Sequence, residues 1–264
     1  MTGASSGIGQ ALAFELGAAG GNLLLVARRA QRLAAVAADV EALGGRAATF
    51  PADLSVESDV ARVAREVLKT AGGVDVLVNN AGRSIRRGVD ASYGRFHDYE
   101  RCMRLNYFAA VRLCLAFLPG MEERRDGHVI NVSSIGLQTS MPRFSAYNPS
   151  KAAVDAFARS IGPELRGRGV AVTTVYMPLV RTRMSAPTTG FRRMPSLDAS
   201  EAARLLARAI VRRPTRVTSR LGAFGQLADA ISPRTVEAFM AATFNFPDAH
   251  ADRAVGQIGH RHVA

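Results

Sequence analysis

The chain has 264 residues, of which 48% are hydrophobic and 21% are charged, and this balance fits a single α/β domain with a substantial core. The composition excludes a disordered chain, a membrane span of about 18 consecutive apolar residues and, with only two cysteines, a disulfide scaffold. The 34 Lys and Arg residues outweigh 22 Asp and Glu residues, which gives a net charge of +12. Because the arginines form scattered pairs rather than one basic face, we expect a solvated surface and no nucleic-acid partner.

A glycine-rich turn, Thr-Gly-Ala-Ser-Ser-Gly-Ile-Gly at residues 2–9, follows directly after Met1. Such a turn normally follows a buried strand and opens a helix, and an amphipathic helical pattern does begin at Ala11. The preceding strand is missing from the sequence. In this class of fold it lies in the middle of the sheet, so its omission leaves about ten backbone groups unpaired at about 1–3 kcal/mol each. We therefore expect the natural polypeptide to extend upstream of Met1.

Downstream of this turn, predicted strands and helices alternate without a linker-like break. We predict strands over residues 22–27, 47–50, 74–78, 128–132, 170–176 and 215–218, and helices over residues 29–43, 57–70, 100–118, 150–165 and 199–211. This alternation predicts an α/β fold with a doubly wound parallel sheet flanked by helices, its first strand truncated. Cys102 and Cys114 share one predicted helix, too far apart for a disulfide, and we expect buried thiols in a cytoplasmic, reducing compartment.

Two regions interrupt the alternation. Residues 177–197 are rich in Pro, Arg and Thr and too long for an ordinary connection, which favours a lid over a substrate. Residues 221–246 carry a series of large apolar side chains, and we favour a pair of helices packed on the sheet. The alternative is an apolar mouth for a greasy substrate, or a peripheral contact with a membrane. We assign residues 1–218 to the dinucleotide-binding catalytic part and residues 219–264 to a helical extension and tail of the same domain.

The glycine turn and the end of the next strand predict a dinucleotide site. Gly3, Gly7 and Gly9 allow the backbone to approach a pyrophosphate, to which the following helix presents its N-terminal amides. An acidic residue at the end of the next strand would bind the ribose 2′-hydroxyl of NAD. The chain has Arg28 and Arg29 there, a pair able to bind a 2′-phosphate, so we favour NADP(H) over two merely solvated arginines.

Four polar residues have the spacing of a proton-transfer site. Tyr147 and Lys151 are four residues apart and share one helical face, and Pro149 between them places the pair in the first helical turn. A nearby ammonium favours the phenolate of the tyrosine. Ser134 follows a predicted strand and is placed to hold a carbonyl oxygen. Asn106, inside a predicted helix, either satisfies a kinked backbone or holds a water near the lysine.

The segment Asn-Asn-Ala-Gly at residues 79–82 ends another strand at the carboxyl edge, where ligands bind in such sheets. The five histidines show no ligand spacing, and no cluster of His, Cys and carboxylates indicates a metal site, so we expect none.

Together these motifs resemble, in order and spacing from Thr2 to about Thr218, those of the short-chain dehydrogenase/reductase family. The resemblance implies a Rossmann-type sheet, a nicotinamide cofactor and a catalytic tetrad of Asn106, Ser134, Tyr147 and Lys151. In that scheme Tyr147 transfers the proton and Ser134 positions the carbonyl, while Lys151 binds the nicotinamide ribose and lowers the pKa of Tyr147, and Asn106 supports a proton-relay water. The cofactor contacts implied are Gly3, Ser5, Ser6, Gly7, Ile8, Gly9, Arg28, Arg29, Asp53, Leu54, Asn80, Ala81, Gly82, Tyr147, Lys151, Pro178, Val180 and Thr182.

One departure narrows the resemblance. Most members have Pro-Gly ahead of the threonine at 182, whereas residues 176–182 read Tyr-Met-Pro-Leu-Val-Arg-Thr. With residues 82–87, 95–100 and 143–147, this segment is similar to bacterial NADPH-dependent fatty acyl-CoA reductases, through about Pro247. This similarity implies reduction of a long-chain acyl thioester to an aldehyde, or of a fatty aldehyde. The loop residues Arg83, Arg86 and Arg87 then either contact the phosphates of coenzyme A or are solvated.

Three expectations remain open beside this one. The same tetrad serves a 3-oxoacyl or hydroxysteroid-type ketone reductase, and an alternative of another class is a non-catalytic cofactor-binding domain of a longer fused protein. The resemblance also implies a homo-oligomer, formed through the helices that hold Asn106 and Tyr147.

Overall fold

The strands are parallel throughout and fall into two sheets in the computed structural model, which describes residues 1–188, 190–191 and 194–244. One sheet pairs β1 (Asn22–Ala27) with β2 (Arg46–Pro51). The other has the order β3 (Val76–Asn79), β4 (Gly127–Ser134), β5 (Val170–Met177) and β6 (Arg216–Val217). Every predicted strand is present, so the expected parallel arrangement is confirmed.

The first residues of the chain join the two sheets. The amide of Val26 in β1 donates to the carbonyl of Met1 at 3.0 Å, and the amide of Thr2 donates to the carbonyl of Val78 in β3 at 2.9 Å. Thr2 also forms a parallel bridge with Val26. The order across the molecule is therefore β2, β1, residues 1–4, β3, β4, β5 and β6, and the winding direction reverses at residues 1–4. In such folds a ligand binds beside this reversal.

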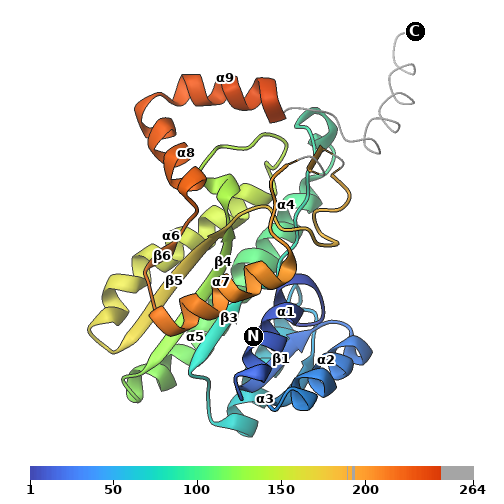
Figure 1. Ribbon diagram of the computed structural model, residues 1–264, viewed down its shortest axis with the longest axis vertical. Helices are drawn as coiled ribbons and strands as arrows, with labels where there is room; N and C mark the ends of the chain where they lie inside the picture. The colour runs from blue at the N-terminus through green and yellow to red at the C-terminus, as the bar shows by residue number, and fades with distance from the viewer. Residues whose placement is uncertain (189, 192–193, 245–264) are drawn as a thin grey trace.

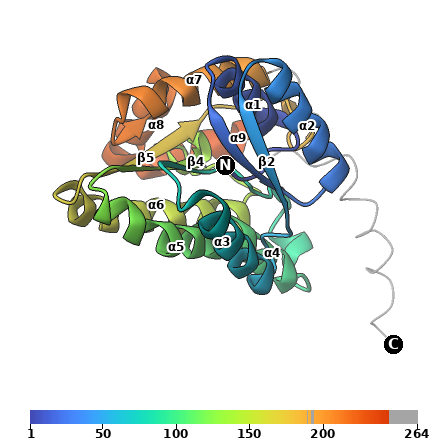
Figure 2. The same ribbon diagram turned by 90° about the horizontal axis from the view of Figure 1, so that it is seen from below.

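Helices cover both faces of the strands (Figure 2). On one face lie α3 (Glu57–Ala71), α5 (Ala109–Glu123) and α6 (Tyr147–Arg166), and on the other lie α1 (Gly7–Ala18), α2 (Ala30–Ala42) and α7 (Ala199–Arg212). Their buried sides carry aliphatic residues at helical spacing, such as Val60, Val63 and Val67 of α3. This three-layer arrangement confirms the predicted doubly wound α/β fold.

A long helical segment holds one of the predicted site residues. It runs from α4 (Phe96–Met103) through a π-helical turn (Arg104–Phe108) into α5, and it continues past Pro119 to Glu123 instead of ending there. Phe96–Glu123 is long and apolar enough to span a membrane, by length and composition only. It packs against the strands through Leu113, Cys114 and Phe117, as a core helix does.

The C-terminal helices differ from expectation in their packing. The apolar segment forms α8 (Arg220–Ile231) and α9 (Pro233–Phe244), which pack on one another, and Figure 1 shows α9 lying across the top of the molecule. The prediction of a helix pair is right, but its packing on the sheet is wrong, because α9 buries none of its residues and α8 buries only Gly222. The remainder of the predicted tail, residues 245–264, lies outside the described residues.

Candidate active site

The predicted site residues gather at the carboxyl ends of the strands, on both sides of the reversal in winding. Arg28 follows β1, Asn79 ends β3 and Ser134 ends β4. Tyr147 opens α6, whose residues pack along β4 and β5. Parallel strands bring their carboxyl ends to one edge, so residues distant in sequence meet there.

The glycine turn is fastened to the end of β3 by the side chain of Thr2. Its hydroxyl accepts hydrogen bonds from the amides of Asn80 at 3.0 Å and Ala81 at 2.9 Å, and it donates to the carbonyl of Val78 at 3.2 Å. The side-chain amide of Asn80 returns a bond to the carbonyl of Thr2 at 3.0 Å. Asn80 and Ala81 therefore shape the floor of the turn.

Two glycines of the turn disfavour a side chain, Gly9 because it has no room for one and Gly7 because of its backbone conformation. A Cβ on Gly9 would lie 2.3 Å from the carbonyl oxygen of Gly3 and 2.7 Å from Nδ2 of Asn80. Gly7 has φ of +58°, a conformation that other residues rarely adopt, and a Cβ there would contact Thr182 at 3.4 Å. The bare backbone and the amino end of α1 thus face the space that a pyrophosphate needs, and the residues present fit a dinucleotide.

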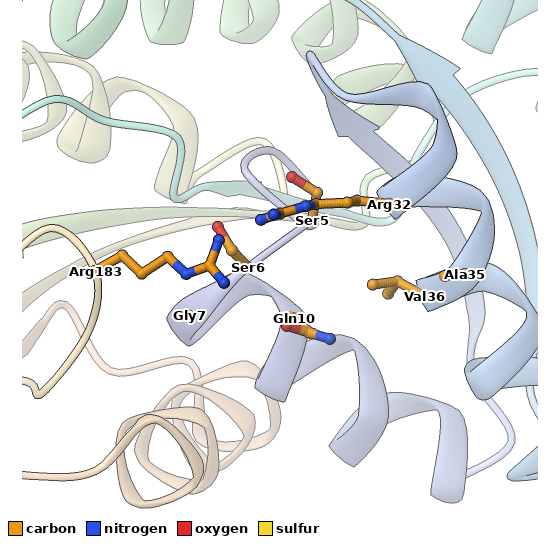
Figure 3. A pocket seen from close by; sticks show the side chains of 8 residues that line it. All are labelled: Ser5, Ser6, Gly7, Gln10, Arg32, Ala35, Val36 and Arg183. Carbon is orange, nitrogen blue, oxygen red and sulfur yellow. The ribbon is translucent and has the colours of Figure 1, made fainter.

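A cavity of about 300 Å³ lies beside this turn (Figure 3). Ser5, Ser6, Gly7 and Gln10 form one side of it. The arginines that line it are Arg32 of α2 and Arg183, which the sequence analysis did not single out. In the sequence, Arg32 lies one helical turn after Arg29, and Arg183 directly follows Thr182. Neither spacing by itself indicates that the two arginines share a cavity.

The predicted adenine-pocket residues lie beside the end of β1. Leu54 is buried, and the Asp53 carboxylate accepts bonds from the amide and the hydroxyl of Ser55 at 2.9 and 2.7 Å. Arg28 lies 3.6 Å from Oδ2 of Asp53. Desolvation opposes ionisation of Asp53, but the bonds from Ser55 and the charge of Arg28 prevail and lower its pKa. Arg28 is therefore held at the strand end by an acid.

Tyr147 and Lys151 occupy the first turns of α6, as predicted from their spacing and from Pro149. The ammonium of Lys151 donates to the carbonyl of Val132 in β4 at 2.8 Å. A Cβ on Gly82 would lie 3.4 Å from both Nζ of Lys151 and Oδ1 of Asn106. The structure thus brings Gly82, Asn106 and Lys151 together from three separate segments.

Ser134 faces Tyr147. The two side chains share a hydrogen bond, and the Ser134 hydroxyl also accepts from the amide of Gly136 at 3.1 Å. A hydroxyl held in this way by its own loop is oriented toward the tyrosine. The pair can present two O–H donors to one carbonyl oxygen, as an oxyanion site requires.

Asn106 lies in the π-helical turn, fully enclosed, and it binds backbone. Its Nδ2 donates to the carbonyl of Arg83 at 2.9 Å, its Oδ1 accepts from the amide of Arg83 at 2.8 Å, and Nδ2 also donates to Oγ of Ser150 at 2.8 Å. Of the two roles left open by the sequence, backbone satisfaction is the one seen, although the backbone satisfied is that of the Arg83 loop. π-helical turns often mark functional sites.

Burial governs the proton affinities of the tyrosine and the lysine. It raises the pKa of Tyr147 to about 12, although the hydrogen bond with Ser134 acts in the opposite direction, and it lowers the pKa of Lys151 to about 8. Burial sets the direction of the shift in the chain by itself, and the lowering of the Tyr147 pKa by Lys151 stays a prediction. Tyr147 remains a neutral phenol throughout the neutral pH range.

The segment at 177–197 crosses the site at two points. Val180 pairs with Leu197 at its base, and Ser185 Oγ accepts from the amide of Thr182 at 3.0 Å. Farther along, the ring of Phe191 stacks on that of Phe144 with 6.2 Å between centroids, and Phe144 meets Tyr147 edge-on at 5.9 Å. Pro178, Val180 and Thr182 lie after the end of β5, on the expected edge, while residues 189, 192 and 193 lie outside the described residues.

The three loop arginines that were expected to contact coenzyme A or solvent each have a different neighbour in the structure. Arg87 lies 3.3 Å from Oδ2 of the buried Asp98, so its charge is already matched. Arg86 donates to the carbonyl of Phe244 at the end of α9 at 3.2 Å. Arg83 adjoins Asn106 through its backbone.

The described part of the chain contains no group of three or more His, Cys, Asp or Glu side chains arranged for a metal ion. His128 is a core residue whose Nε2 bonds to Oγ1 of Thr173 at 2.8 Å, and burial lowers its pKa to about 4. Cys102 and Cys114 are free, buried thiols, as expected.

Comparison with known proteins gives consistent results. A family model described as short chain dehydrogenase matches residues 1–192. The chain is 48% identical over 255 residues to an uncharacterized oxidoreductase of Mycobacterium tuberculosis, covering 95% of this chain and 75% of the relative. It is 47% identical over 252 residues to a fatty acyl-CoA reductase of Acinetobacter baylyi, covering 95% of this chain and 85% of the relative. A short-chain dehydrogenase from Sphingobium yanoikuyae, solved in complex with NADPH, is 27% identical with a TM-score of 0.77 and covers 95% of this chain and 96% of its own.

Proposed function

Because this chain belongs to the short chain dehydrogenase family, we propose that this oxidoreductase is an NADPH-dependent reductase of lipophilic carbonyl compounds, with a long-chain fatty acyl-CoA or a fatty aldehyde as its substrate. The observation that carries the reductase assignment is the convergence of Ser134, Tyr147 and Lys151 beside the glycine turn. The similarity to relatives named fatty acyl-CoA reductase, at 46–47% identity, supports the substrate class.

Several features favour NADP(H) over NAD(H). No acidic residue ends β1, where an acid would bind the ribose 2′-hydroxyl, and Arg28 and Arg29 stand there instead. The backbone of the glycine turn, closed to any Cβ at Gly9, fits the pyrophosphate that both dinucleotides carry, so the choice between them rests on the two arginines. The similar structure from Sphingobium yanoikuyae was solved with NADPH.

The chain's own residues divide the proton chemistry between them. Bound NADPH supplies the hydride for the carbonyl carbon. The Tyr147 hydroxyl donates a hydrogen bond and then its proton to the substrate carbonyl oxygen, and its raised pKa keeps that proton available at neutral pH. Ser134 donates a second hydrogen bond to the same oxygen. With an acyl thioester, reduction would give a hemithioacetal, whose C–S bond then breaks. The sulfur leaves as a thiolate and takes up the proton that the hydroxyl loses, so the products are the aldehyde and free coenzyme A thiol.

Lys151 and Asn106 hold this arrangement in place. Lys151 stands one helical turn from Tyr147 and is held by its bond to Val132, which supports the proposal that it binds the nicotinamide ribose. Asn106 fixes the Arg83 loop and Ser150, and Ser150 Oγ in turn donates to the carbonyl of Tyr147 at 2.6 Å. The start of α6 is thereby fastened to the π-helical turn.

The apolar side chains around the site support a lipophilic substrate. Helix α8 lies beside the segment that follows Ser134, and the two are joined by a hydrogen bond from Gln138 to Oε1 of Gln226 in α8 at 3.1 Å. Phe144 and Phe191 add a stacked aromatic pair next to Tyr147. Of the three loop arginines, we retain Arg83 as a candidate contact for a coenzyme A phosphate.

We further propose a cytoplasmic homo-oligomer that touches membranes peripherally. Phe108, at the end of the π-helical turn, and Leu115 of α5 are 43% and 62% exposed, and these apolar side chains support self-association through the long helical segment. Sedimentation of the purified chain tests this proposal, since a single monomeric species at all concentrations contradicts it. The exposed apolar face of α8 supports the membrane contact.

Oxidation of NADPH by the purified chain, measured with palmitoyl-CoA, hexadecanal and a 3-oxoacyl thioester, tests the function. We expect turnover of palmitoyl-CoA or hexadecanal. Turnover of the 3-oxoacyl thioester alone would favour the ketone reductase, and no turnover of any of them by a folded preparation that binds NADPH would favour a non-catalytic domain.

A further inference from the structure

Two arginines from separate segments face each other across the cavity beside the glycine turn. Arg32 extends from α2 and Arg183 from the segment after β5, and Figure 3 shows their guanidinium groups pointing toward one another over Ser5 and Ser6. Between them lies a space of about 300 Å³, bounded below by Gly7 and Gln10. No Asp or Glu is among the residues that line it.

The cavity is strongly positive and its charges are unmatched. The pKa of Arg29 is lowered, by desolvation and then by the charges of Arg32, Arg183 and Arg28, which shows that the four groups share one neighbourhood. Arg28 has Asp53 as its partner, whereas Arg29, Arg32 and Arg183 have no acidic partner in the part of the chain that the structure describes. Guanidinium groups that face one another repel, and an anion between them removes the repulsion.

The position of Arg183 is set by rigid neighbours. Thr182 lies against Gly7, since a Cβ on that glycine would come within 3.4 Å of its methyl group. Ser185 Oγ donates to the carbonyl of Val180 at 2.7 Å and accepts from the amide of Thr182 at 3.0 Å. The backbone beside Arg183 is therefore held at the amino end of α1, and Ser6, at the N-cap of that helix, makes no capping bond with its side chain.

We propose that Arg183 and Arg32 bind one phosphate group of the dinucleotide from opposite sides, with Ser5 and Ser6 beneath it. This inference rests on the proposed NADP(H) cofactor and adds a contact from the segment after β5. That segment also carries Phe191, stacked on Phe144 beside Tyr147. A phosphate bound by Arg183 thus fastens the same segment that borders the substrate side of the site.

Equilibrium binding of NADPH and NADH to the full chain tests the proposal by calorimetry. Arg183→Gln and Arg32→Gln each remove one charge-assisted contact, and we expect each to raise the Kd for NADPH about tenfold. Arg181→Gln is the matched control, because Arg181 lies on the same segment but donates to Oγ of Ser196 at 3.1 Å and does not line the cavity. We expect the control to keep the Kd of the parent chain.

The two nucleotides identify the phosphate. NADH has the pyrophosphate but lacks the 2′-phosphate, so an unchanged Kd for NADH assigns the pair to the 2′-phosphate, and an equal loss for both nucleotides assigns it to the pyrophosphate. A Kd for NADPH that stays within about twofold of the parent value in both Arg183→Gln and Arg32→Gln, with thermal unfolding unchanged, overturns the proposal. A parent chain that binds NADPH but reduces no acyl-CoA or aldehyde overturns the proposed substrate and leaves the phosphate contact standing.

Discussion

The side-chain amide of Asn106 lies 2.8 Å from Oγ of Ser150 and links the π-helical turn to the helix that begins with Tyr147. Both side chains are buried, and each also binds backbone: Asn106 that of Arg83 and Ser150 that of Tyr147. The relationship explains why a polar residue sits inside an apolar helix. It sets the position of Tyr147 relative to the loop that follows Gly82.

This link predicts an energetic coupling between the two residues. Asn106→Ala leaves the amide and carbonyl of Arg83 without their partner, so we expect a loss of about 1–3 kcal/mol in the free energy of unfolding. Ser150→Ala removes the shared bond from the other side. In a double-mutant cycle measured by denaturant unfolding, we expect a coupling of about 0.5–3 kcal/mol. Strictly additive effects would show that the bond contributes nothing to the folded state.

Tyr147→Phe removes the proton donor and keeps the ring that packs against Phe144. We expect kcat to fall about 10²–10⁴-fold, the usual contribution of a general acid, while the Kd for NADPH stays within about twofold. Steady-state turnover and calorimetry of the same preparation measure the two quantities. Activity near that of the parent chain would exclude Tyr147 as the acid.

The pH dependence of turnover follows from Lys151. Burial lowers its pKa to about 8, whereas Tyr147, with a pKa of about 12, does not titrate below that range. Lys151 therefore loses its positive charge as the pH rises through about 8, and we expect kcat/KM for reduction to fall there. Lys151→Arg keeps the charge, and any activity that it retains should lack this limb. A kcat/KM that is constant from neutral pH to well above 8 would contradict the assignment.

The lowered pKa of Lys151 also affects stability, which we expect to rise over the pH range in which turnover falls. Because the pKa of Lys151 is lower in the folded chain than its ordinary value of 10.5, the folded state binds fewer protons between about 8 and 10.5. The cost of burying the ammonium is present in full below about 8 and disappears as the pH rises to 10.5. Chemical denaturation across this interval should show the parent chain gaining stability relative to Lys151→Met.

The glycine turn predicts a contrast between two substitutions to alanine. At Gly9 the added Cβ meets the carbonyl of Gly3 at 2.3 Å, whereas at Gly167 it meets nothing within 4 Å and φ is −69°. We expect Gly9→Ala to cost about 1–3 kcal/mol of stability and to weaken NADPH binding, and Gly167→Ala to be neutral or to stabilise by about 0.4–1 kcal/mol. Equal behaviour of the two variants would mean that the turn relaxes around the new methyl group.

Short-range spacing predicted much of this site, and tertiary contacts decided what the spacing missed. The glycine turn and the pair Tyr147 and Lys151 were found because each depends on residues within one turn of helix or loop. Arg32 and Arg183 were missed because α2 and the segment after β5 converge only once the sheet has formed. Spacing did not predict the raised pKa of Tyr147 for a related reason, since that shift comes from burial of the phenol.

The C-terminal helices show the same limit. The apolar periodicity of residues 221–246 predicted helices correctly, but periodicity identifies an apolar face without saying what covers it. In the structure α8 buries only Gly222, so the sheet does not cover its apolar face. Its four exposed large apolar side chains are Leu221, Phe224, Leu227 and Ile231.

That face supplies the last prediction. Phe224 and Leu227 are 69% and 58% exposed, Arg220 begins the same helix, and the chain carries a net charge of +12. An exposed apolar stripe on a chain of net positive charge favours the surface of an anionic bilayer. We expect the chain to sediment with phosphatidylglycerol vesicles and the double variant Phe224→Ser, Leu227→Ser to remain in solution. Val211→Ser, at an 82% exposed valine in the last turn of α7, is the matched control and should still sediment. If the control also fails to sediment with vesicles, or if the double variant still sediments with them, then α8 is not what binds the membrane. If the chain self-associates in the absence of vesicles, the apolar face of α8 belongs to a contact with a second copy of the chain.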